Sequence, residues 1–160
     1  MLALNPRPST VSATSDPAQT RVFITGTAAF LPGEPIDNDR MEDFIGRMPS
    51  GCSAVGRRAL RWNGIRRRHY ALDPDGSWLH SNASMCAAAV RGALDSAGLS
   101  LSGLDCLAAA TTQGDLLVPG HASAVHGELG GEPLELASFQ SVCASSLMAA
   151  NRSWSTRCST

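Results

Sequence analysis

The sequence predicts an α/β fold built around a largely parallel sheet. Segments with strand character alternate with helical segments at least three times along the chain. Residues 104–110 are apolar apart from Asp105, as expected of a strand that is buried on both faces. The chain has 160 residues, of which 43% are hydrophobic and 17% are charged, which suits one globular domain.

The charges of the chain nearly cancel. Thirteen basic residues, all of them arginine, stand against fourteen acidic ones, and the formal net charge is -1. Such a chain has no overall field that would draw it to nucleic acid or to an anionic membrane, and it has no apolar run of about 18 residues. We therefore expect no nucleic-acid partner and no membrane association. Because lysine is absent, Schiff-base chemistry and a P-loop lysine are excluded within this chain.

The cysteines are spaced too widely for a zinc knuckle, since no two lie closer than fifteen residues. Their odd number, without a secretory signal, favours free thiols in the cytoplasm over a disulfide framework. We expect no metal site and no cofactor from these residues. The five are Cys52, Cys86, Cys106, Cys143 and Cys158.

The N-terminal part of the chain divides into a tail and the start of a domain. Residues 1–20, rich in Pro, Ser and Thr, are expected to be disordered, and 21–150 to form one domain. Residues 21–25 alternate like a short buried strand. Asp37 or Asn38 can cap a helix that ends near 49–51. Its apolar stripe consists of Met41, Phe44, Ile45 and Met48.

The middle of the chain contains the clearest helix signal. A short helix at 54–62 and a strand at 65–72 are predicted, with turns at Asn63-Gly64 and at 73–76. After Ser81 or Asn82, small apolar residues recur at helical spacing up to Ala97, and Gly98 is suited to end the helix. The small side chains allow this helix to approach a sheet closely.

The last third repeats the alternation. A buried strand at 104–110 leads into a loop at 113–120, and a short helix at 122–129 ends at a Gly-Gly pair. A second strand is predicted at 134–139, and a helix from Cys143 to about Asn151. Residues 151–160 break the apolar pattern and are expected to be irregular.

Cys143 is the strongest candidate for a catalytic residue. It lies where a predicted buried strand gives way to a predicted helix, so its thiol meets a helix N-terminus. The free amide groups and the positive end of the dipole there favour an ionised thiol, and they can hold an oxyanion during acyl transfer. The alternative is that Cys143 is a small, inert core residue, which is the commoner case for a cysteine judged by position alone.

Three loops are expected at one end of the sheet. They are 26–33, 113–120 and the turn before Cys143, and each follows a predicted strand. Open α/β sheets bind ligands at the carboxyl ends of their strands. This placement favours a functional role for Cys143.

A dense basic segment covers 57–69. Such a cluster can bind the phosphates of a nucleotide, a phosphopantetheine arm or an acidic carrier surface. It is equally typical of a solvated edge whose arginines pair with acidic residues elsewhere. RNA binding is a third option, weakened by the single aromatic residue and the near-neutral chain. The segment contains Arg57, Arg58, Arg61, Trp62, Arg66, Arg67, Arg68 and His69.

The four histidines are candidate bases or ligands, but surface or satisfied core positions are the more common case. None is spaced i, i+4 from another, as a helical metal pair requires. The glycines form no dinucleotide-binding or P-loop fingerprint and are read as turns and caps. The histidines are His69, His80, His121 and His126.

Four sequence blocks together resemble the N-terminal half of a β-ketoacyl-acyl-carrier-protein synthase III. In order and spacing they cover about residues 21–150, and the second and fourth are together fairly specific. Some segments look most similar to the branch that condenses acyl chains in dialkylresorcinol and related aryl-lipid pathways. The blocks are RVFITGTAAFLPG from Arg21, NGIRRRH from Asn63, ATTQ from Ala110 and SFQSVCASSLMA from Ser138.

The resemblance implies a thiolase-like fold of two similar α/β halves, with Cys143 as the nucleophile. In such a Claisen condensation the cysteine takes an acyl group from a thioester, and a carrier-bound malonyl or β-ketoacyl thioester then attacks it. Products of this family enter fatty acid, polyketide or aryl-lipid biosynthesis. The implied partner is an acyl carrier protein or another acyl thioester.

The resemblance also assigns expected substrate contacts. The loop from Gln113 to Pro119 would line the acyl tunnel, and Val118 would reach the pocket of a second subunit in a homodimer. Family members that use coenzyme A commonly clamp its adenine with Trp and Arg before the Gly-Ile-Arg block. Here Arg58 and Trp62 occupy those positions, so the clamp is altered and a carrier-protein donor is favoured.

The chain is short for the family. The His and Asn that assist decarboxylation belong to a second half of comparable size, so we expect a truncated enzyme that does not condense by itself. The alternative is a non-catalytic module whose arginine segment docks an acidic carrier protein or nucleic acid.

Overall fold

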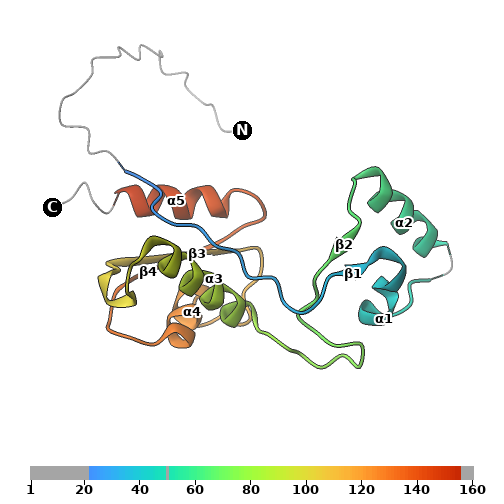
Figure 1. The fold of residues 1–160 in the computed structure, drawn as a ribbon, viewed down its shortest axis with the longest axis horizontal. Coiled ribbons are helices and arrows are strands. Elements are labelled where there is room, and N and C mark those ends of the chain that lie inside the picture. Colours follow the sequence, from blue (N-terminus) through green and yellow to red (C-terminus); the bar gives the residue numbers. More distant parts are fainter. Residues whose placement is uncertain (1–21, 50, 156–160) are drawn as a thin grey trace, which may run out of the picture.

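The computed structural model describes residues 22–49 and 51–155. Its main body contains two parallel strands, β3 (Cys106–Thr111) and β4 (Glu135–Gln140), with three helices around them. These helices are α3 (Asn82–Ala97), α4 (His121–Leu129) and α5 (Ser145–Ser155). Figure 1 shows a second group of elements extending from this body. The predicted α/β class is confirmed, with a parallel pair at its centre.

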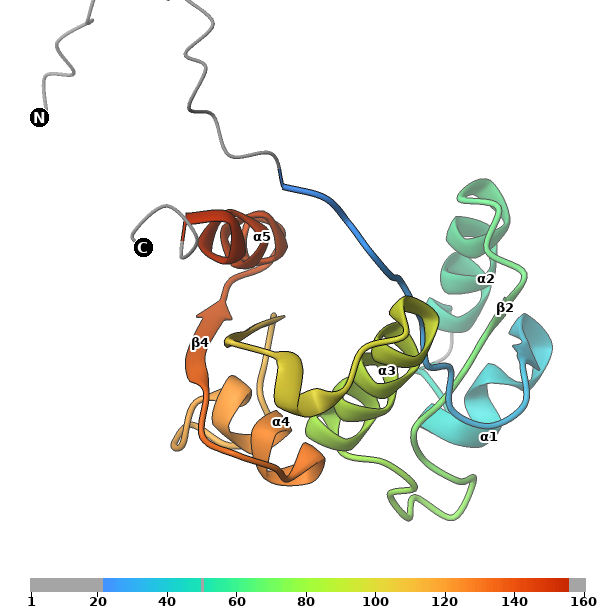
Figure 2. The ribbon, with the colours of Figure 1, turned by 60° about the vertical axis from the view of Figure 1, so that its left-hand side comes forward.

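The second group is a small lobe. It comprises β1 (Ile36–Asp37), the 3-10 turn η1 (Asn38–Arg40), α1 (Met41–Ile45), α2 (Cys52–Trp62) and β2 (Arg67–Arg68). β1 and β2 pair antiparallel. Figures 1 and 2 both show α1 and α2 projecting away from α5 and β4. A second short 3-10 turn, η2 (Leu101–Gly103), precedes β3 in the main body.

The two faces of the β3–β4 pair contact different helices. The strands pair in register from Cys106 opposite Glu135 to Thr111 opposite Gln140. On one face, the Ser138 hydroxyl accepts a hydrogen bond of 2.8 Å from the Ala122 amide of α4. On the other, Arg152 of α5 forms an ion pair with Glu135. The sheet is therefore covered by α5 on one side and by α4 on the other, with α3 packed against α4 (Figure 2).

The core lies between α3, α4 and β3. Its buried members are Ala83 and Ala87 of α3, Leu107 of β3 and Val125 of α4. The small side chains of α3 pack mainly against α4, so the predicted close approach of this helix to the sheet is not confirmed. The helix begins with a capping box between Ser81 and Ser84 and ends at Gly98 with φ 65°, which confirms both predicted ends.

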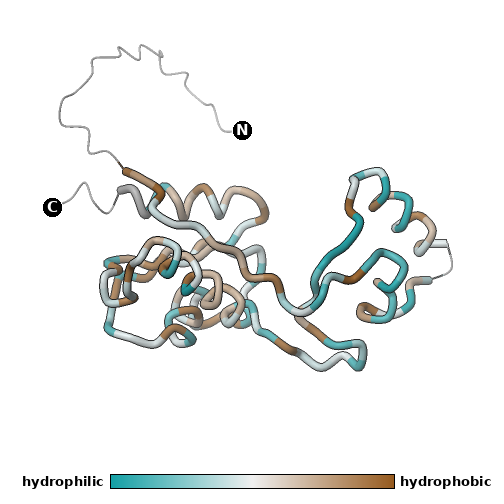
Figure 3. The backbone as a smooth tube through the Cα atoms, in the orientation of Figure 1, coloured by the Kyte–Doolittle hydropathy of each residue, from teal (hydrophilic) through white to brown (hydrophobic). Residues whose placement is uncertain are grey.

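The predicted strand at 21–25 is wrong for its described residues. Residues 22–25 are extended but unpaired, and Ile24 is 81% exposed. A strand needs a neighbour that completes its hydrogen bonds, and none flanks this segment among the described residues. The chain instead crosses α3, where Gly26 and Ala28 approach the backbone and small side chains of that helix. Figure 3 shows the apolar colouring of this unpaired stretch.

The predicted strand at 65–72 is mostly wrong. Only Arg67–Arg68 pair with a strand, and Leu72 forms an isolated bridge with Trp78. The partner strand β1 is two residues long, so the remaining residues of 65–72 have no strand residues opposite them. The turn at 73–76 is confirmed by a hydrogen bond from the Gly76 amide to the Asp73 carbonyl, 2.9 Å long.

Several helix ends differ from the predicted ones. The first helix stops at Gly46, whose φ of 80° suits glycine, instead of continuing to 49–51. The last begins at Ser145, two residues after Cys143, and continues to Ser155, past the predicted end near Asn151. The expected tail at 1–20 and residues 156–160, including Cys158, lie outside the described residues. Among those described, no helix has the length and apolar character needed to cross a membrane.

Candidate active site

Cys143 lies in the turn between β4 and α5, two residues before the helix begins. The Ser141 amide donates to the Thr111 carbonyl at the end of β3, over 3.2 Å. The Ser145 hydroxyl donates to the Ser141 carbonyl over 3.0 Å, and Ser145 is only 3% exposed. These two contacts fix the turn to the sheet and to the first residue of α5. The first amides of a helix lack intrahelical acceptors, and α5 begins two residues after Cys143.

The thiol of Cys143 is exposed, not buried in the core. The alternative that placed Cys143 in the core is therefore wrong about its burial, and its reactivity stays a prediction. Three apolar residues of the same segment, Val142, Leu147 and Met148, are exposed as well. An exposed thiol among apolar side chains is reachable by an acyl chain, and it has a helix N-terminus beside it.

The loops after β3 and β4 leave the same end of the sheet. Because Thr111 pairs with Gln140 in a parallel register, the loop from Gln113 and the turn with Cys143 begin side by side. This part of the three-loop prediction is confirmed. The third loop, 26–33, was predicted to follow a strand of the same sheet. Residues 22–25 before it form no strand, so this prediction is wrong.

Gln113 lines a cavity of about 520 Å³. The cavity lies between the loop after β3, the start of α3 and the segment around Trp78. The Gln113 carbonyl accepts hydrogen bonds from the Thr111 hydroxyl at 2.8 Å and from the Asn82 side-chain amide at 3.0 Å. The predicted wall residue is thus held in place through its backbone. The lining residues are Ala71, Trp78, His80, Ser81, Asn82, Met85, Gln113, Gly114 and Asp115.

Asp115 joins this loop to α3. Its two carboxylate oxygens accept hydrogen bonds of 2.8 Å each from the amides of Asn82 and Ala83. A carboxylate at a helix N-terminus satisfies free donors and stabilises the dipole. Sequence reasoning missed Asp115 because the loop and the helix are separated by more than thirty residues. Only a structure shows that a loop carboxylate caps a distant helix.

Replacing Asp115 with alanine is expected to lower the free energy of unfolding by about 1–2 kcal/mol, because two helix amides lose a charged acceptor. Chemical denaturation of both proteins measures this difference. Asp105→Ala is the matched control, since Asp105 is also exposed and its side chain forms no hydrogen bond or ion pair among the described residues. Equal stability of Asp115→Ala and Asp105→Ala would contradict the capping role.

The other predicted site residues lie on different elements from Cys143. Val118 is 82% exposed on the loop after β3. Arg58 and Trp62 belong to α2 in the lobe, and Trp62 is 89% exposed. Figures 1 and 2 show α2 well separated from α5. The structure therefore places Gln113 near the end of the sheet where Cys143 lies, and it does not bring Arg58 or Trp62 there.

Three of the four histidines contact other groups of the protein. His69 Nδ1 lies 3.0 Å from the Pro32 carbonyl, and His126 Nε2 lies 3.1 Å from the Glu132 carbonyl. His80 meets the ring of Phe30 edge-on. His121 is buried at the start of α4, with its Nδ1 unpartnered among the described residues. No group of three or more His, Cys, Asp or Glu side chains in the described part of the chain is placed to hold a metal ion.

The thiols differ in surroundings, which predicts an order of reactivity. Burial raises the pKa of the Cys86 thiol on α3, whereas Cys143 and Cys52 are exposed. Since the thiolate is the reactive form, iodoacetamide near pH 8 should alkylate Cys143 and Cys52 before Cys86. Peptide mass mapping over time measures the order. Alkylation of Cys86 as fast as Cys143 would show that α3 does not shield it.

Comparison with known proteins shows which proteins this chain is similar to. No protein-family model matches it. It is 33% identical over 129 residues to a β-ketoacyl-acyl-carrier-protein synthase III of Hyphomonas neptunium, and 32% identical over 124 residues to one of Roseobacter denitrificans. The chain is a partial match to the β-ketoacyl-acyl-carrier-protein synthase III family. The matches cover 81% and 78% of this chain but 36% and 35% of those relatives, so it spans about a third of their length.

A solved structure supports the same synthase III resemblance. The chain superimposes on a tetronic acid condensing enzyme with a TM-score of 0.72 and 27% identity, covering 85% of this chain and 40% of that one. The predicted thiolase-like class is therefore confirmed. The similarity to synthase III that the sequence blocks indicated is confirmed as well.

Proposed function

We propose that this chain accepts an acyl group on Cys143 as the first half of a Claisen condensation. The Cys143 thiolate attacks the carbonyl carbon of an acyl thioester, and the donor thiol leaves with its electron pair and takes up a proton. The observation that carries this proposal is the exposed thiol in a turn fixed between a parallel strand and a helix N-terminus. Helix amides beside the sulfur would stabilise the tetrahedral oxyanion.

The second half would be attack on the acyl-enzyme by a carrier-bound malonyl or β-ketoacyl thioester. By resemblance, the His and Asn for decarboxylation lie outside the segments matched in these 160 residues. We therefore expect this chain alone to form an acyl-enzyme without completing condensation. The proposed setting is fatty acid, polyketide or aryl-lipid biosynthesis in the cytoplasm, including the dialkylresorcinol branch.

The substrate contacts extend the proposal. Gln113 and its loop would form part of the acyl tunnel, and Val118 would enter the pocket of a second subunit in a homodimer. The exposure of Val118 supports this role, because an apolar side chain on a loop gains by moving from water into the pocket of a partner. Arg58 and Trp62 would contribute to donor recognition from the lobe.

Incubating the chain with an acyl thioester and following its intact mass tests the proposal. The expected result is an increase by one acyl group, which hydroxylamine removes because a thioester is labile to it. Adding a malonyl-carrier thioester should leave the acyl-enzyme in place and give no condensed product. No gain in mass would reject acyl transfer, and a condensed product would reject the expected inactivity in condensation.

A further inference from the structure

Ser145, the first residue of α5, is buried although its side chain is polar. Among residues 22–49 and 51–155, the buried polar residues are Ser145 and His121. The next buried residue on the same face of α5 is Ala149, one turn later, so an apolar side chain suits this face. Burying a hydroxyl lowers stability unless the hydroxyl forms a hydrogen bond. The serine at 145 therefore depends on the contact that its hydroxyl makes.

That contact closes the turn around Cys143. The Ser145 hydroxyl donates to the Ser141 carbonyl over 3.0 Å, and the Ser141 amide donates to the Thr111 carbonyl at the end of β3 over 3.2 Å. Cys143 stands midway between Ser141 and Ser145 in the sequence. The hydroxyl therefore joins the two ends of the five-residue segment that contains the thiol, and it links that segment to both the sheet and the helix.

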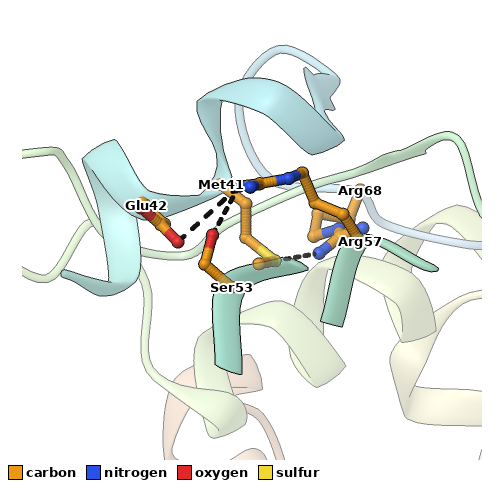
Figure 4. A network of polar contacts seen from close by, with 5 residues as sticks. All are labelled: Met41, Glu42, Ser53, Arg57 and Arg68. Atoms are coloured by element: carbon orange, nitrogen blue, oxygen red, sulfur yellow. Dashed lines mark hydrogen bonds and ion pairs between the residues drawn. The ribbon is translucent and has the colours of Figure 1, made fainter. Parts of the chain in front are cut away.

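The serine beside the other exposed thiol at a helix start is bonded differently. Cys52 is the first residue of α2, and Ser53 after it accepts a hydrogen bond from Arg57, one turn further along the same helix (Figure 4). Arg57 also lies 4.0 Å from the Glu42 carboxylate. The Ser53 hydroxyl thus contacts its own helix. Within the described residues, no side-chain hydrogen bond closes a turn around Cys52.

We propose that Ser145 is a positioning residue for acyl transfer to Cys143. This inference rests on the proposed function, because it concerns the thiol that this function uses. When a thiolate attacks a thioester, the carbonyl oxygen becomes an oxyanion and must lie at hydrogen-bond distance from its donors as the sulfur reaches the carbonyl carbon. By holding Ser141 to the first residue of α5, the Ser145 hydroxyl fixes the thiol relative to the first amides of that helix.

A positioning role affects reactions that form an oxyanion more than reactions that do not. Alkylation of a thiolate by iodoacetamide is a direct displacement, in which the sulfur–carbon bond forms as iodide leaves with its electron pair. No oxyanion arises, and the reaction requires only an accessible thiolate. Loss of the Ser145 hydroxyl should therefore slow the acylation of Cys143 and leave its alkylation unchanged.

The test compares the wild-type chain with Ser145→Ala, using an acyl-N-acetylcysteamine thioester as the donor. We expect the limiting first-order rate of acylation to fall by about tenfold or more, while the half-saturating donor concentration changes less than about twofold. Intact-mass measurements over time at several donor concentrations give both values. The rate of alkylation at Cys143, followed by peptide mapping, should stay within about twofold of the wild-type rate.

Ser146→Ala is the matched control for this variant. Ser146 is the next residue of α5, it is exposed, and its hydroxyl forms no hydrogen bond among the described residues, so the control should acylate at the wild-type rate. Equal acylation rates in the wild type and Ser145→Ala, or equal losses of acylation and alkylation in that variant, would overturn the inference while the proposed function stands. A wild-type chain that does not acylate would overturn the proposed function and the inference with it.

Discussion

Replacing Cys143 with alanine is expected to abolish acyl transfer to the chain, lowering its rate by at least about a thousandfold. The reason is that Cys143 is the one thiol in the turn between β4 and α5, and removing a covalent nucleophile costs several orders of magnitude in comparable enzymes. Intact-mass measurement of the acylated fraction over time, with an acyl thioester in excess, gives the two rates.

Cys52→Ala is a stringent control for this experiment. Cys52 is also an exposed thiol, and it is the first residue of α2, a helix as long as α5. It differs from Cys143 because α2 follows no strand of the parallel sheet. Cys52→Ala should therefore keep the wild-type acylation rate. Equal losses in the two variants would show that any exposed thiol at a helix start reacts, and that the sheet contributes nothing.

Replacing Gly26 with alanine is expected to lower the free energy of unfolding by about 2 kcal/mol. A Cβ atom at this position would lie 2.6 Å from the Ala93 carbonyl oxygen and 2.8 Å from the Ala97 side chain. Both belong to α3, whose backbone cannot yield without disturbing the core beneath it. The substitution should push residues 22–28 away from the helix. Thermal and urea unfolding of the variant measure the loss.

Gly127→Ala provides the matched control for the Gly26 substitution. Gly127 lies in α4, and a Cβ there meets nothing within 4 Å. Alanine favours a helix over glycine, so this variant should gain up to about 1 kcal/mol. The same chemical change is thus expected to act with opposite sign at the two positions. A stabilised Gly26→Ala variant would show that the extended segment does not rest on α3.

The elements of the main body could be predicted because their signals are local. α3 contains its own capping residues, its own small apolar face and its own terminal glycine, and the structure has all three where the sequence places them. The strand at 106–111 is a short apolar run, whereas the strand at 135–140 mixes polar and apolar residues, and each is followed by a loop that the sequence marks. The position of Cys143 follows from these neighbours.

The elements that depend on a distant partner could not be predicted. The alternation at 22–25 has strand character, yet a strand forms only where another strand pairs with it. The run at 65–72 failed for the same reason, since its partner Ile36–Asp37 is two residues long. Asp115 was missed because its role comes from a helix far away in the sequence. Local chemistry identified the nucleophile, and tertiary contacts determined which loops surround it.

Peptide mapping of the acylated chain tests the central claim most directly. The chain is incubated with an acyl thioester, digested, and the acyl group is located by tandem mass spectrometry at each cysteine. We predict that the label lies on Cys143 and that Cys52, equally exposed at a helix start, remains free. Equal label on both cysteines, or label on neither, would contradict the account.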